Sequence, residues 1–179
     1  MDRIRIVKSD ITKLDTDAIV NAANSGLRAG GGVCGAIFRA AGYDRLQEAC
    51  DRIGYCDVGS AAITPAFDLK AKFIIHAVGP RWVDGLHGEY QQLYGAYTKA
   101  LELAVENNCG SIAFPLISAG IFGYPMEQAW ECAVSACRNF LHKHKQDGIR
   151  VVFAVRDDEI IRTGQTILKQ NAEEYTTLP

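Results

Sequence analysis

The sequence predicts an α/β fold in which a mixed, mostly parallel sheet lies between two layers of helices. Strand-like runs alternate with helical patterns along the chain, which is typical of βαβ units. The run "SIAFPLI" is continuously apolar after its first residue, as expected of a strand covered on both faces. A length of 179 residues suits one domain with a sizeable core. We therefore expect a three-layer α/β/α sandwich over residues 1–170, followed by a C-terminal tail at 171–179.

The first half of the chain predicts four strands and two helices. Apolar or alternating runs predict strands at 3–10, 17–23, 60–66 and 72–79. Apolar residues at helical spacing predict helices at 33–41 and 43–53. His76 falls inside a predicted strand, "KFIIHAVG", so we expect it to be a core histidine.

The second half predicts three helices and two strands. These elements are a helix at 89–108, a strand at 111–117, a helix at 125–145, a strand at 149–155 and a helix at 157–171. Pro125 suits the start of its helix because the missing N–H of proline has no partner in a first turn anyway. Gly148 suits the end of that helix. We expect the last residues, "AEEYTTLP" (172–179), to be frayed.

Composition and charge narrow the class of protein. The formal net charge of −2 gives no basic footprint, so we expect no nucleic-acid partner. No apolar run approaches a membrane span, and the N-terminus reads as a strand rather than a signal peptide, so we expect no membrane partner and a cytoplasmic location. The six cysteines form no C-x-x-C pair and are expected to be free thiols. We expect neither a metal nor a cofactor, and the oligomeric state stays open.

Two glycine-bearing loops predict an anion site. Gly30, Gly31 and Gly32 stand directly before a predicted helix, whose N-terminus offers unpaired N–H groups and the positive end of its dipole. A second loop, "SAGIFGYP" (118–125), also follows an apolar strand and leads into a helix. Because ligands bind beyond the carboxyl ends of strands in open α/β sheets, the two loops could hold a diphosphate from two sides.

Two common nucleotide motifs do not fit these loops. Gly30, Gly32 and Gly35 satisfy G-x-G-x-x-G, but they do not follow the first strand directly, and no acidic residue ends a strand about 20 residues later. A dinucleotide-dependent oxidoreductase is therefore a minor alternative. The sequence also lacks G-x-x-x-x-G-K-[ST], which excludes a P-loop nucleotidase.

Five motifs in order resemble those of the macrodomain family. They are "SDIT" (9–12), "IVNAAN" (19–24), "GGGV-GAI-RAAG" (30–42, with Cys34 and Phe38 in the gaps), "HAVGP" (76–80) and "ISAGIFGYP" (117–125). The resemblance implies an α/β/α sandwich with a mixed sheet of about six strands and ADP-ribose as ligand. Many members hydrolyse ADP-ribose esters, on acidic side chains or in O-acetyl-ADP-ribose, whereas others only bind. An ADP-ribosylated protein or metabolite is therefore the implied partner.

The resemblance also implies roles for individual residues. Asp10 matches the carboxylate that accepts a hydrogen bond from the adenine amino group, with the backbone of Ile11 beside it. Asn24 matches the amide that binds and orients the distal ribose. Phe122 would pack against that ribose, and Arg156 would stack on the adenine. The other implied binding positions are Ala22, Gly31, Gly32, Val33, Ser118, Ala119, Gly120 and Ile121.

Without the resemblance, each of these side chains has a plainer explanation. Asp10 suits the N-cap of a short helix at "ITKL". Asn24 before Ser-Gly suits a turn. Phe122 could be a core residue, and Arg156 could pair with one of the two aspartates that follow it.

Cys34 separates two hypotheses on function. Bacterial and mitochondrial-type hydrolases of the family usually have an aspartate at this position and a histidine where this chain has Phe38. Coronavirus macrodomain hydrolases also lack that aspartate and resemble this chain in "SAGIFG". Asn24 and both loops are intact, which favours a hydrolase, whereas Cys34 favours a binding module without chemistry. RNA binding or ribonuclease regulation, known for some relatives, has no basic patch here to support it.

Overall fold

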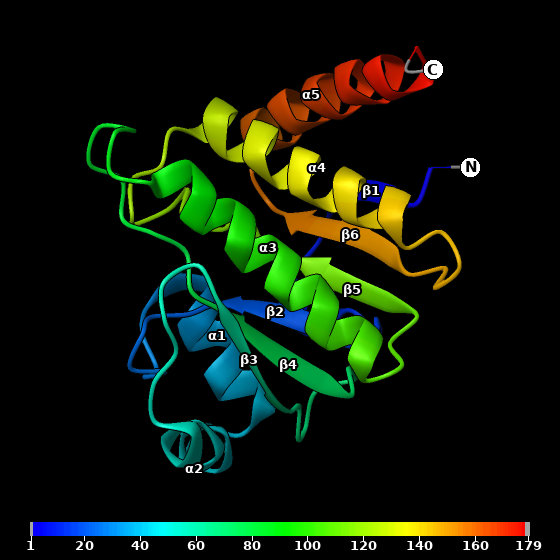
Figure 1. Cartoon of the computed structure of the whole chain (residues 1–179). Coiled ribbons are helices and arrows are strands. Elements are labelled where there is room, and N and C mark those ends of the chain that lie inside the picture. The colour runs from blue at the N-terminus through cyan, green and yellow to red at the C-terminus, as the bar shows by residue number, and fades with distance from the viewer. Residues whose placement is uncertain (1, 178–179) are drawn as a thin grey trace.

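A computed structural model describes residues 2–177 and contains one six-stranded sheet. The strands are β1 (Ile4–Lys8), β2 (Ala18–Ala22), β3 (Ala61–Pro65), β4 (Phe73–Ala77), β5 (Ser111–Phe114) and β6 (Arg150–Val155). Their order across the sheet is β1-β6-β5-β2-β4-β3 (Figure 1). Only β3 runs antiparallel to its neighbour, and the other pairs are parallel. The predicted mixed, mostly parallel sheet is confirmed.

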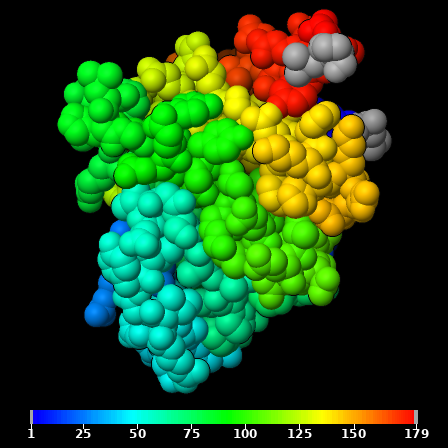
Figure 2. All heavy atoms as spheres, in the orientation of Figure 1, coloured from blue at the N-terminus to red at the C-terminus, as the bar shows by residue number. Residues whose placement is uncertain are grey.

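Two helical layers cover the sheet. The helices are η1 (Ile11–Lys13, a single 3₁₀ turn), α1 (Gly32–Ala41), α2 (Tyr43–Ile53), α3 (Glu89–Glu106), α4 (Met126–Lys143) and α5 (Asp158–Thr176). On one face α3, α4 and α5 pack in a row, and on the other lie α1 and α2 (Figure 1). The space-filling view shows the layer of α3 and α4, with the segment before α3 projecting from it at the upper left (Figure 2).

Each layer has its own apolar core because successive residues of a strand point to opposite faces. In β2, Val20 joins the core under α3 and α4, and the preceding Ile19 joins the core under α1 and α2. The first core contains Tyr97 of α3 and Trp130 of α4, both fully buried. The predicted three-layer α/β/α sandwich is therefore confirmed.

Most predicted elements are present with ends displaced by a few residues, but two expectations were wrong. The strand expected at 111–117 ends at Phe114, because Pro115 has no N–H to continue the ladder and the chain turns into a loop. The tail expected to fray from 172 is helical as far as Thr176. Arg138 of α4 donates from Nε to Oδ1 of Asn171 at 3.0 Å and holds this last part of α5 against the layer. The domain boundary at 170 stays a prediction.

Two further features concern the state of the cysteines and the apolar content of the helices. All six cysteines are free and buried, which confirms that prediction. Within residues 2–177, none of the helices combines the length and the apolar content that crossing a bilayer would require.

His76 is a core histidine, as predicted, and it joins three strands through its ring nitrogens. It is fully buried on β4, with Nδ1 3.1 Å from Nδ2 of Asn21 on β2 and Nε2 3.0 Å from Oγ1 of Thr64 on β3. If Asn21 donates to Nδ1, the ring must carry its proton on Nε2 and donate it to Thr64. Burial lowers the pKa of His76 to about 4, so the ring is neutral at neutral pH.

Acidification should therefore destabilise the protein through His76. In the unfolded chain a histidine titrates near 6.5, so between that pH and about 4 the unfolded state binds the extra proton and the free energy of unfolding falls as pH falls. The full effect is about 3 kcal/mol. Urea denaturation across this pH range should show the slope in the wild type and lose it in His76→Gln. Equal slopes in the two proteins would contradict this assignment, and direct NMR titration of His76 serves if the variant does not fold.

Candidate functional site

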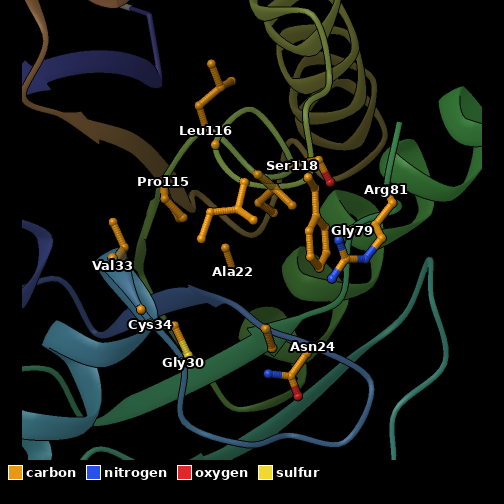
Figure 3. Close-up of a pocket in the computed structure, with 17 residues that line it drawn as sticks. Ala22, Asn24, Gly30, Val33, Cys34, Gly79, Arg81, Pro115, Leu116 and Ser118 are labelled. Atoms are coloured by element: carbon orange, nitrogen blue, oxygen red, sulfur yellow. The ribbon is translucent and has the colours of Figure 1, made fainter. Parts of the chain in front are cut away.

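A cavity of about 500 Å³ opens at the carboxyl ends of the central strands. The residues that line it are Ala22, Ala23, Asn24, Gly30, Gly31, Gly32, Val33, Cys34, Gly79, Arg81, Pro115, Leu116, Ile117, Ser118, Gly120, Ile121 and Phe122. They follow β2, β4 and β5, which are parallel and so end at the same edge of the sheet. Figure 3 shows Val33 and Cys34 on one side of this cavity and Ser118 and Arg81 on the other.

The first glycine loop ends in an uncapped helix N-terminus. Gly31 is the N-cap of α1 and supplies no side chain to accept from the first N–H groups. Gly32 has φ +57°, a conformation that favours glycine. A Cβ on Gly35 would lie 2.5 Å from the carbonyl oxygen of Gly30, so only glycine lets the loop pack this closely on the helix. Unpaired N–H groups and the helix dipole make this wall of the cavity suitable for an anion.

The second loop presents a similar wall. Ser118 has φ +67°, and its carbonyl accepts from the N–H of Tyr124 at 2.9 Å, which closes the loop. In the described part of the chain, Gly120, Ile121 and Phe122 lie outside helices and strands, and the N–H groups of these three residues donate to no backbone carbonyl. Consecutive free N–H groups in a turn form a site for phosphate oxygens. The cavity therefore has hydrogen-bond donors from the backbone on both sides.

The structure brings together most of the predicted site residues. Those that line the cavity are Ala22, Asn24, Gly31, Gly32, Val33, Cys34, Ser118, Gly120, Ile121 and Phe122. Ala119 lies in the second loop but not among the lining residues. The three residues expected at the adenine, Asp10, Ile11 and Arg156, lie outside this cavity. They follow β1 and β6, which are neighbours at the same edge of the sheet.

Asp10 is the N-cap of η1, as expected of this residue without the family resemblance. Its second carboxylate oxygen accepts no hydrogen bond within the described residues. Its Oδ1 accepts from the N–H of Thr12 at 3.0 Å and from the Thr12 hydroxyl at 2.7 Å. These hydrogen bonds, opposed by burial and helped by the charge of Arg156, lower the pKa of Asp10. Arg156 is exposed and forms no ion pair with Asp157 or Asp158 within the described residues, since Asp158 pairs with Lys8. The ends of β1 and β6 thus offer an ionised carboxylate near an unpaired guanidinium.

Asn24 closes a turn and also lines the cavity. Its Nδ2 donates to the carbonyl of Arg28 at 2.8 Å, and its Oδ1 accepts from the N–H of Arg28 at 3.0 Å. One hydrogen of Nδ2 and one lone pair of Oδ1 are left for a ligand. Cys34 is buried, with its sulfur 3.8 Å from the same carbonyl of Arg28. Phe122 is only half-buried and lies on the cavity wall, so it is not a core residue.

Sequence reasoning missed several lining residues, and Arg81 is the most consequential. The missed positions are Ala23, Gly79, Arg81, Pro115, Leu116 and Ile117. Arg81 is the one charged side chain among the residues that line the cavity. Its guanidinium carbon lies 4.6 Å from the centre of the Phe122 ring. The motif "HAVGP" ends one residue before it and could have pointed to this position.

Three titratable side chains near the cavity lie close enough together to be considered as a metal site, but the backbone already uses one of their carboxylates as a hydrogen-bond acceptor. Asp84, His87 and Glu89 place one ligand atom each within 4.8 Å of one another. Oε2 of Glu89 accepts from the N–H groups of Val83, Asp84 and Gly85, and Oε1 accepts from that of His87. Burial alone would raise the pKa of Glu89, but these backbone donors outweigh it and lower the pKa to about 2. The carboxylate thus holds the loop before α3 and has no free oxygen directed at a metal.

The fold and the site define a class: an α/β/α sandwich with a cavity between two glycine-bearing loops at the carboxyl edge of its sheet. The Macro domain family model matches residues 20–133 of the chain. The chain belongs to the macro domain family. The sequence resemblance to macrodomains is confirmed.

Similar proteins cover nearly the whole chain. A macro domain-containing protein of Chlorobaculum tepidum is 48% identical over 92% of this chain and 95% of its own. An O-acetyl-ADP-ribose deacetylase of Escherichia fergusonii is 46% identical over 96% of this chain and 98% of its own. The structure of an Oceanobacillus iheyensis macrodomain with ADP is similar at a TM-score of 0.88 and 38% identity, over 94% of this chain and 91% of that one.

Proposed function

We propose that this protein binds ADP-ribose, with the diphosphate between the two glycine loops. The observation that carries the proposal is the pair of cavity walls with free backbone N–H groups, one at the start of α1 and one at Gly120–Phe122. The similar Oceanobacillus structure holds ADP, the part of ADP-ribose that contains this diphosphate. Val33 and Ile121, both exposed on the rim of the cavity, would cover the ligand from two sides.

The adenosine would lie toward the ends of β1 and β6. There Asp10 has a free carboxylate oxygen for the adenine amino group, and the guanidinium of Arg156 can stack on the base. Ile11 would offer its backbone beside the ring, and Ala119 would belong to the second loop, on the wall opposite the first glycine loop. At the other end of the cavity, Asn24 and Phe122 would hold the distal ribose.

We further propose that the protein hydrolyses ADP-ribose esters, on acidic side chains of a protein or in O-acetyl-ADP-ribose. Asn24 lines the same cavity as both loops, which supports this proposal, and a relative 46% identical over nearly its full length is named a deacetylase of that metabolite. The alternative is a binding module without turnover, which Cys34 favours because a thiol replaces a carboxylate there. We also propose that the protein is located in the cytoplasm.

One experiment separates these alternatives. The protein is incubated with an ADP-ribosylated glutamyl peptide and, separately, with O-acetyl-ADP-ribose, and the products are analysed by mass spectrometry. Calorimetry measures the affinity for free ADP-ribose in parallel. Release of ADP-ribose establishes the hydrolase, whereas tight binding without release establishes the module. Absence of ADP-ribose binding would overturn both.

Cys34→Ala and Cys34→Ser should leave both binding and turnover nearly unchanged. The sulfur is buried against the carbonyl of Arg28, and no histidine lines the cavity to activate it as a nucleophile. Calorimetry and initial rates on an ADP-ribose ester check this. A loss of turnover by about 100-fold or more in Cys34→Ser, with binding unchanged, would instead make Cys34 a catalytic residue.

A further inference from the structure

A second, smaller cavity lies beside the first. It has a volume of about 350 Å³ and shares four lining residues with the larger one, Asn24, Gly79, Arg81 and Phe122. Its remaining walls come from Ser25, from Val58 before β3, from the segment that follows β4, and from His87 and the first turns of α3. If the distal ribose lies against Asn24 and Phe122, this smaller cavity is where a group attached to that ribose would go.

Arg81 stands at the junction of the two cavities. Its side chain is exposed and lies over the ring of Phe122. Within the described residues it pairs with no carboxylate and donates to no protein acceptor, so its N–H groups are available to a ligand. Figure 3 shows the guanidinium beside the cavity, on the same side as Asn24.

The loops that carry this guanidinium are fixed to each other. The N–H of Trp82 donates to the carbonyl of Phe122 at 2.8 Å, which ties the residue after Arg81 to the second glycine loop. A Cβ on Gly79 would lie 2.2 Å from the hydroxyl oxygen of Ser118, so the two segments are in close contact there as well. Arg81 is therefore held in place over Phe122 rather than lying on a free surface loop.

The other charge at this junction, a carboxylate, is held by hydrogen bonds within the protein. The carboxylate of Glu89 lines the smaller cavity, but it accepts four backbone N–H groups of its own loop and is nearly fully buried. The side chains of Asn24, Gln92 and His87 add neutral or donating groups to the walls. Of these two charged groups, only the guanidinium of Arg81 has hydrogen-bonding groups free for a ligand, and its donors suit an oxygen acceptor such as a carboxyl group.

We propose that the smaller cavity receives the acyl group that an ADP-ribose ester carries on its distal ribose, and that Arg81 binds a carboxyl oxygen of this group. The inference rests on the proposed function, because it places ADP-ribose in the larger cavity. Hydrolysis adds one water across the ester C–O bond and gives a ribose hydroxyl and a free acid, which loses its proton at neutral pH. Negative charge therefore develops on the acyl oxygens, where the guanidinium can stabilise it.

The test compares two ligands that differ at one position of the distal ribose, where only one of them carries an acyl group. One is ADP-ribose, and the other is the N-acetyl analogue of O-acetyl-ADP-ribose, whose amide resists hydrolysis. Arg81→Leu keeps an apolar side chain over Phe122 but removes the charge. We expect it to weaken binding of the analogue roughly tenfold and binding of ADP-ribose less than about threefold. Arg81→Lys should recover part of the difference. Where the wild type hydrolyses the ester, kcat/KM should fall by roughly 10- to 100-fold in Arg81→Leu.

Arg45→Leu is the matched control. The Arg45 guanidinium lies over the ring of Phe67 at 5.2 Å, a similar contact outside both cavities, so this variant should bind both ligands as the wild type does. Equal weakening of both ligands by Arg81→Leu would mean that Arg81 contacts the diphosphate or the ribose, and this would overturn the inference. Unchanged binding of both would overturn it too. Failure of the wild type to bind ADP-ribose is a separate result, which overturns the proposed function itself.

Discussion

Gly31→Val should strongly weaken the binding of ADP-ribose and leave the fold intact. Gly31 has φ −85° and ψ −177°, an extended conformation that valine adopts readily. A Cβ at this position would meet no protein atom within 4 Å, and the residue lines the larger cavity. The new side chain would therefore occupy space that the proposed diphosphate needs. We expect calorimetry to show a loss of at least about 100-fold in affinity, with an unchanged thermal unfolding midpoint.

The choice of glycine decides what this experiment measures. Gly32→Val would also fill the cavity, but the φ of +57° at Gly32 makes any side chain there strained, so the variant would mix misfolding with lost binding. Gly110→Val is the matched control, because it lies before β5, outside both cavities, and its Cβ would make an ordinary contact with Asp17 at 3.5 Å. Unchanged affinity in Gly31→Val would show that the first loop does not hold the ligand.

The fold was predictable because local signals and burial agree along most of the chain. α2 covers residues 43–53 as predicted, since Leu46 and Cys50 recur at helical spacing and Gly54, with φ +84°, ends the helix. The end of α5 was not predictable. Its last turns are held by contacts to α4, such as that between the rings of Tyr175 and His142 at 6.0 Å, and residues so far apart in sequence leave no periodic signal.

The site, like the fold, was predictable from the sequence only in part. Glycine-bearing loops before helices are visible in the sequence and identify both walls of the cavity. An arginine after a strand is not distinctive, and what places Arg81 in the site is its contact with Phe122, which lies 41 residues later in the chain. Asp10 does cap a helix and Asn24 does close a turn, as expected without the family resemblance, but these roles do not use the whole side chain. Each side chain uses part of its hydrogen-bonding capacity for a local turn and keeps the rest free.

Because Asn24 both closes a turn and lines the cavity, its substitution is the second change for which we expect a large effect. Asn24→Ala should lower the hydrolysis of an ADP-ribose ester by about 100-fold or more, because a ribose no longer held in the reacting geometry loses most of its rate. Affinity for ADP-ribose should fall less than about tenfold, the cost of a lost hydrogen bond. The substitution also removes both bonds to Arg28 and so loosens the turn over residues 24–28. Initial rates and calorimetry on the same preparation measure the two effects separately.

Gln47→Ala shows whether the amide or the turn is responsible. Gln47 accepts from the N–H of Ala29 at 3.0 Å and donates to the carbonyl of Leu27 at 3.2 Å, so it holds the same turn while lying outside both cavities. If Asn24 acts by orienting the distal ribose, Gln47→Ala should keep most of the rate even if its unfolding midpoint drops. Equal losses of rate in Gln47→Ala and Asn24→Ala would mean that an ordered turn is all the reaction requires. Equal losses of rate and affinity in Asn24→Ala would reduce Asn24 to an ordinary binding contact.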